Sequence, residues 1–81
     1  MGGAMDLMLR RFPAYKDVIF RQMSASARFR AMCTDYKEAL ETLEKWEHTA
    51  TPQGASYVKD YRRLVAELER EILDELLDND V

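Results

Sequence analysis

The chain has 81 residues and a formal net charge of −3, with 47% hydrophobic and 33% charged residues. A chain of this length forms one domain with a small core, and its many periodic apolar residues exclude a disordered chain. Its single cysteine excludes an intramolecular disulfide, and no apolar run approaches the ~18 residues that a membrane span needs. We therefore expect one soluble domain over residues 1–81, cytoplasmic and without membrane association.

The N-terminal part is predicted to contain a flexible arm over residues 1–11 and a short helix over 13–23. Pro13 suits a first helical turn because its missing N–H would be unpaired there, whereas Phe12 before it is biased toward extended geometry. A helix that starts at Asp6 and is kinked at Pro13 stays open as an alternative. It also stays open whether residues 2–4 are native or whether the natural start is Met5.

A long helix is predicted over residues 25–48. Its apolar residues recur at spacings of three and four, which is one face of a helix packed on a partner. This stripe consists of Phe29, Met32, Cys33, Tyr36, Leu40, Leu43 and Trp46. Ser24 or Ser26 can cap the helix by accepting a backbone N–H.

A second long helix is predicted over residues 52–77. Thr51 is a natural N-cap with Pro52 at the first helical position. The stripe of this helix consists of Tyr57, Tyr61, Leu64, Val65, Leu68, Ile72 and Leu76, with Leu68 expected at the centre of the seam. The short connection forces the two long helices to lie antiparallel. The fold class is therefore all-α: an antiparallel, coiled-coil-like helical hairpin with a short N-terminal helix.

The hairpin carries more large apolar residues than one seam between two helices can bury. We expect a homodimer that forms a four-helix bundle, since a symmetric pair is the commonest way to bury such a surplus. Trp46 is expected to cover the hairpin end, or to mark a partner site if it is exposed. The interaction residues that we predict are Trp46, Ile72, Leu73, Leu76 and Leu77. The alternative is an adaptor or regulator that binds an unidentified protein through an exposed apolar groove.

The two halves of the chain differ in charge. Residues 1–34 contain six basic and two acidic residues, whereas residues 35–81 contain six basic and thirteen acidic ones. One interpretation is a pair of solvated faces. The other is that the basic N-terminal arm docks on an acidic surface, in the same chain or in another copy. The acidic balance argues against a nucleic-acid partner.

Phe12-Pro13, followed by Tyr15, Asp17, Val18 and Ile19, resembles the opening of YdcH-type proteins, which are small bacterial helical-hairpin proteins of unknown function. Arg28-Phe29 resembles the basic residue and phenylalanine that follow a short break in that family. Leu64, Leu68 and the run Glu71-Ile72-Leu73 are similar to its returning helix. The resemblance extends over about residues 12–77. It implies a bacterial helical hairpin and no reaction.

The candidate residues for chemistry are Cys33 and His48, and neither has a partner in the sequence pattern. Cys33 lies on the apolar stripe and is expected to be a small buried hydrophobe. His48 is fifteen residues further on, about 22 Å along a helix, so the two cannot pair within one chain. It is expected at a helix end, where a cation suits the dipole. We predict no catalytic residue, no cofactor and no metal site, and therefore a non-enzymatic protein.

Overall fold

A computed structural model describes residues 3–49 and 51–79. Four α-helices and one short 3-10 turn make up nearly all of these residues, and they contain no strand. The helices are α1 (Ala4–Arg11), α2 (Lys16–Ala25), α3 (Ala27–Glu47) and α4 (Pro52–Asp78), and the turn η1 (Pro13–Tyr15) lies between α1 and α2. The all-α prediction is thus confirmed, as is the packing of two long helices against each other. The molecule measures 46 × 26 × 21 Å.

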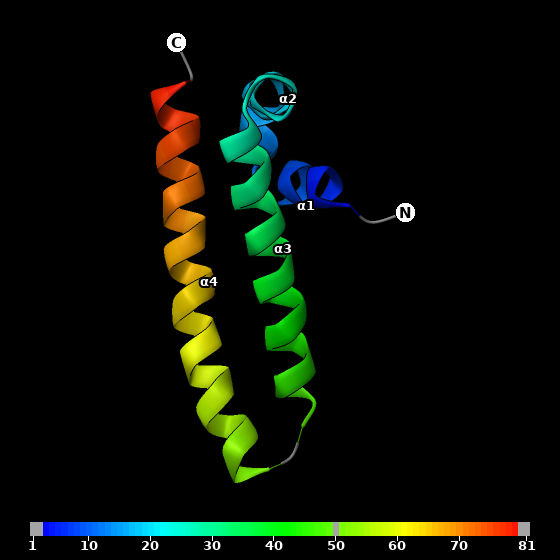
Figure 1. Ribbon diagram of the computed structural model, residues 1–81, viewed down its shortest axis with the longest axis vertical. Helices are drawn as coiled ribbons and strands as arrows, with labels where there is room; N and C mark the ends of the chain where they lie inside the picture. Colours follow the sequence, from blue (N-terminus) through cyan, green and yellow to red (C-terminus); the bar gives the residue numbers. More distant parts are fainter. Residues whose placement is uncertain (1–2, 50, 80–81) are drawn as a thin grey trace.

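The long helices α3 and α4 run antiparallel and form the hairpin, as Figure 1 shows. As the sequence predicts, a serine side chain caps the start of α3 and a threonine side chain caps the start of α4. The backbone N–H of Phe29 donates to Ser26 Oγ at 3.0 Å, and that of Gly54 donates to Thr51 Oγ1 at 2.9 Å. Each hydroxyl satisfies one of the unpaired N–H groups at a helix start.

The N-terminal segment differs from the predicted arm. Residues 4–11 form α1, whose Met8 is fully buried. The chain breaks at Phe12, where Pro13 opens η1 and leads into α2. Of the two alternatives, the structure is closer to a helix interrupted at Pro13, because α1 has an apolar side that α2 and α3 cover.

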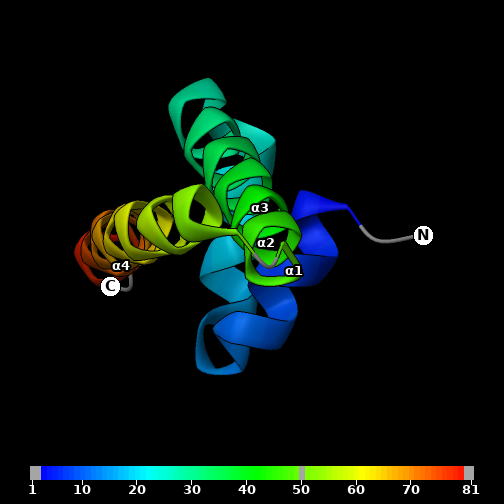
Figure 2. The same ribbon diagram turned by 90° about the horizontal axis from the view of Figure 1, so that it is seen from below.

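In cross-section, α4 and the N-terminal helices α1 and α2 lie around α3. Seen along the long axis, α4 stands on one side of α3, and α1 and α2 lie against other sides of α3 (Figure 2). Helix α3 is therefore the central element, and α4 packs mainly against α3. We call the end of the molecule where α1 and α2 pack on α3 the broad end. The core at this end joins all four helices through residues that are at least 96% buried: Met8, Val18, Ile19, Phe29, Cys33, Tyr36, Ile72 and Leu76.

The predicted stripe of α4 is wider than the seam. Val65, Ile72 and Leu76 are buried, but Tyr61 and Leu68 are only half-buried. The exposed fractions of Tyr57 and Leu64 are 46% and 39%. Leu68, which the sequence predicts at the centre of the seam, packs against the core but is only half-buried, because it also borders a groove.

Candidate interaction surfaces

Two of the grooves that α4 lines contain its leucines and lie on opposite sides of the helix. The first, which we call the acidic groove, is lined by Asp35, Glu38, Ala39, Thr42, Tyr61, Leu64 and Leu68 and has a volume of about 380 Å³. The second, the tail groove, is lined by Phe12, Ala66, Glu69, Arg70 and Leu73 and has a volume of about 360 Å³. They exist because α4 is covered by α3 along one side only.

The predicted interaction residues fall into three environments. Ile72 and Leu76 have no exposed surface and belong to the core of the chain itself. Leu73 lines the tail groove, and Leu77, one turn further on, is 51% exposed. Of the four residues at this end of α4, Leu73 and Leu77 are therefore the ones available to a partner.

Trp46 covers the loop end of the hairpin, which is the first of the two roles predicted for it. Its ring stacks on that of Tyr57 with a centroid distance of 4.5 Å and an interplanar angle of 26°. Beside this stack, Arg62 Nη2 donates to Glu47 Oε2 at 3.1 Å and joins the two helices. The stack and the ion pair hold α3 and α4 together beside the loop that connects them.

The two candidates for chemistry lie far from any reactive partner. Cys33 is fully buried, and burial raises the pKa of its thiol to about 11. A neutral, enclosed thiol is a hydrophobe and not a nucleophile, which agrees with the sequence expectation. His48 is exposed at the end of α3, where its Nδ1 lies 2.7 Å from the carbonyl oxygen of Glu44. Because a carbonyl only accepts, this Nδ1 carries the proton.

A polar pair lies within the apolar seam at the broad end. The hydroxyl of the fully buried Tyr36 donates to Glu69 Oε1 at 2.6 Å. Burial, followed by this hydrogen bond and the negative charge of Glu69, raises the pKa of Tyr36 far above its usual 10.0. Glu69 also lines the tail groove, so the pair ties the inner surface of α3 to the edge of α4.

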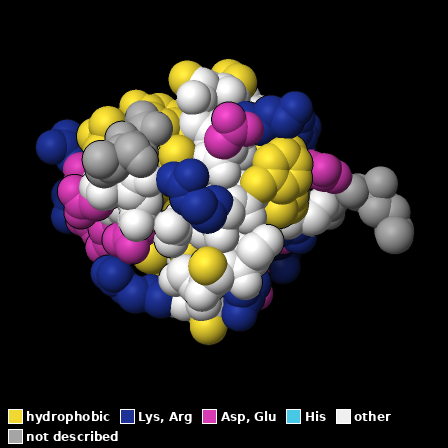
Figure 3. Space-filling model, turned by 90° about the horizontal axis from the view of Figure 1, so that it is seen from above, with side chains coloured by type: hydrophobic (Ala, Val, Ile, Leu, Met, Phe, Trp, Pro, Cys, Tyr) yellow, Lys and Arg dark blue, Asp and Glu magenta, His cyan; other side chains and the backbone are white. Residues whose placement is uncertain are grey.

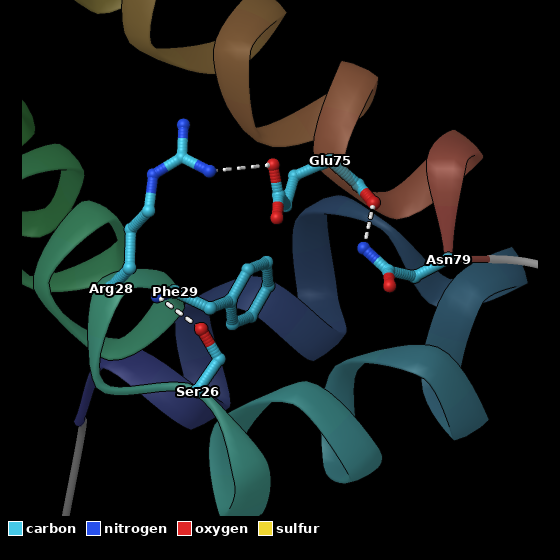
Figure 4. Close-up of polar contacts among 5 residues, drawn as sticks. All are labelled: Ser26, Arg28, Phe29, Glu75 and Asn79. Carbon is cyan, nitrogen blue, oxygen red and sulfur yellow. Dashed lines mark hydrogen bonds and ion pairs between the residues drawn. The ribbon is translucent and has the colours of Figure 1, made fainter.

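Two arginines of α2 and α3 contact the C-terminal end of α4 within the same chain. Arg21 Nη2 donates to the carbonyl oxygen of Asn79 at 2.6 Å, and Arg28 Nη1 donates to Glu75 Oε2 at 3.4 Å. Figure 4 shows Arg28 reaching Glu75 beside the capped start of α3, with Asn79 Nδ2 donating to the carbonyl oxygen of Glu75. Seen from this end, acidic side chains gather on the α4 side with lysine and arginine side chains close by (Figure 3). These two contacts come from α2 and α3, outside the predicted arm over residues 1–11.

In the part of the chain that the structure describes, no three His, Cys, Asp or Glu side chains are close enough together to bind a metal ion. None of the described helices is both long and apolar enough to cross a bilayer. The sequence reasoning missed Ala39 and Thr42, which line the acidic groove from α3. Their spacing from Asp35, four and seven residues, could have shown that they share its face.

Comparison with known proteins adds no relative: the chain matches no family model, no curated protein and no solved structure. The resemblance to YdcH-type proteins therefore stays a prediction.

Proposed function

We propose that this chain is a non-enzymatic helical module that acts through protein–protein contact, and that two copies associate through the tail groove. The observation that carries the proposal is the exposure of Leu77 beside the half-buried Leu73, on a side of α4 that α3 does not cover. Two antiparallel α4 helices, each backed by its own α3, would form a four-helix bundle.

The charges of this side of α4 are compatible with self-pairing. Arg70 Nε lies 3.2 Å from Asp74 Oδ1, so both signs are present beside Leu73. In a two-fold antiparallel pair that crosses near Leu73, Arg70 of one copy lies close to Asp74 or Asp78 of the other. Such pairing also separates the two acidic tails. We further propose a cytoplasmic location, since a protein with one buried thiol needs no oxidising compartment.

Sedimentation equilibrium at tens of micromolar tests the proposal. We expect a dimer for the natural chain and a shift toward monomer for Leu77→Ser, which alters an exposed side chain and leaves the core intact. Leu64→Ser is the matched control, because Leu64 is a partly exposed leucine of the same helix on the other groove. A natural chain that is monomeric, or a dimer that only Leu64→Ser dissociates, would contradict the proposed interface.

A further inference from the structure

Along the acidic groove, an apolar stripe of α4 is only partly covered by α3. The stripe consists of Tyr57, Tyr61, Leu64 and Leu68, whose separations of four, three and four residues place them on one side of the helix. Leu64 is 39% exposed, and the α3 wall of the groove adds Ala39 and Thr42. At 1.5 Å per residue the stripe is roughly 16 Å long, which equals three turns of a partner helix.

Carboxylates border this stripe on both helices. Asp35 and Glu38 line the groove from α3. On α4, exposed acids lie three or four residues from the stripe leucines, and these are Asp60, Glu67 and Glu71. Within residues 3–49 and 51–79, none of the five forms an ion pair. Basic residues close in position include Arg63 on α4, three residues after Asp60 and four before Glu67, and Lys45 on α3, one turn beyond Thr42.

We infer that the acidic groove is a docking site for an amphipathic helix of another protein, one whose apolar stripe is bordered by lysines or arginines. Apolar side chains at i, i+3, i+4 and i+7 of such a helix would lie between Leu64, Leu68 and Ala39. Its basic flanks would pair with the carboxylates on either side. This inference goes beyond the proposed self-association and does not depend on it.

Charge complementarity selects this occupant over the others. A second copy placed face to face on the same groove would bring its own carboxylates against these, which is unfavourable at moderate salt. A nucleic acid would meet the same repulsion from the bordering acids. The tail groove has no such border, because Arg70 lines it together with Glu69.

A synthetic peptide of about 14 residues, helical in design with leucines along one face and lysines on the others, is the probe. Titration calorimetry at ~0.15 M salt, where exposed charges are screened beyond about 8 Å, measures its binding to the full chain. We expect binding by this peptide and none by a peptide of the same composition with its residues reordered. A version with glutamate in place of lysine should also fail to bind.

Charge reversals on α3 locate the binding face. Glu38→Lys, in the groove, should weaken binding about tenfold, as expected when an attractive charge becomes a repulsive one. Glu44→Lys makes the same charge change at an exposed position outside the groove and should leave binding within about twofold. Leu64→Ser should abolish binding without altering the sedimentation of the chain.

Three results would overturn the inference. The first is that the lysine peptide does not bind, or that the reordered peptide binds equally well. The second is an equal loss in Glu38→Lys and Glu44→Lys, which would mean a general attraction to an acidic protein. The third is dissociation of a dimer by Leu64→Ser, which would assign the groove to a second copy.

Discussion

Gly54 is the residue whose role depends most on its neighbours. In the first turn of a helix a glycine is unfavourable compared with alanine, by up to about 1 kcal/mol. Here it is buried, and a Cβ at this position would lie 2.8 Å from the carbonyl oxygen of Thr49 and 3.1 Å from Thr51 Oγ1. The absence of a side chain lets the hairpin loop close against the capped start of α4.

We predict that Gly54→Ala destabilises the chain by about 1–3 kcal/mol, although alanine is the better helix former. The added methyl group must displace the backbone at Thr49 or disturb the hydrogen bond from Gly54 N–H to Thr51 Oγ1. Urea unfolding monitored by circular dichroism measures the change. Ser56→Ala, an exposed neighbour in the same turn, is the control and should change stability by less than about 0.5 kcal/mol. A more stable Gly54→Ala protein would show that the loop has room for the methyl group.

Two buried ionisable groups of the core, the thiol of Cys33 and the hydroxyl of Tyr36, predict that the folded chain loses stability at alkaline pH. The folded chain raises the pKa of the Cys33 thiol from 9.0 to about 11, and it raises the pKa of the Tyr36 hydroxyl from 10.0. The unfolded chain therefore releases these protons first, so the stabilisation is complete below pH 9 and falls as the pH rises toward 11 and beyond.

Urea midpoints measured between pH 8 and pH 11 check this prediction. We expect a steeper fall for the natural chain than for Cys33→Ala or Tyr36→Phe, each of which removes one of the ionisable groups. Both variants lose some stability at pH 8, so the comparison is between slopes and not between absolute values. Identical slopes in all three proteins would mean that neither group controls the alkaline transition.

The long helices follow from the sequence, but the N-terminal helices follow only in part. The stripes and caps of α3 and α4 are local signals, and the structure starts and ends these helices within two residues of the predicted bounds. Helix α1 has only eight residues, too few to be stable alone, and forms because α2 and α3 cover it. Met5, Met8 and Phe12, spaced three and four apart, were the available signal.

The grooves could not be read from periodicity, for a geometric reason. Seven apolar residues of α4 satisfy one helical stripe, yet a single neighbour buries only those that face it directly. Which edge stays open depends on where α1 and α2 pack, and the sequence does not specify that position. The charges around the stripe were visible in the sequence, but their joint placement beside Leu64 required the structure.

Because α1 belongs to the core, we predict that Met8→Ala destabilises the chain by about 2–5 kcal/mol, the range for truncating a fully buried side chain. A flexible arm would give no such effect. Arg10→Ala, at an exposed position of the same helix, should change stability by less than about 0.5 kcal/mol. Thermal unfolding of both variants makes the comparison, and equal midpoints would mean that α1 does not pack on α3.

At the scale of the whole molecule, arginines from the basic half of the sequence contact the C-terminal end of α4. The last turn of α4 contains Asp74, Glu75 and Asp78, which lie at the negative end of the helix dipole and would favour fraying. The guanidinium of Arg21 supplies the compensating charge, because it donates to the carbonyl oxygen of Asn79. Arg28 adds an exposed ion pair with Glu75 at 3.4 Å, a contact that is weaker in salt.

We predict that Arg21→Gln frays the end of α4 and leaves its middle intact. Loss of the cation from the helix end should reduce the free energy of local opening by about 0.3–1 kcal/mol, so amide exchange over residues 75–79 should become up to about fivefold faster. Amides near Val65 should be unchanged, since they lie three turns away. Arg63→Gln, at an exposed position of α4, is the control for loss of a positive charge. If Arg63→Gln accelerates the same terminal amides equally, net charge controls the end of α4 and not the contact between Arg21 and Asn79.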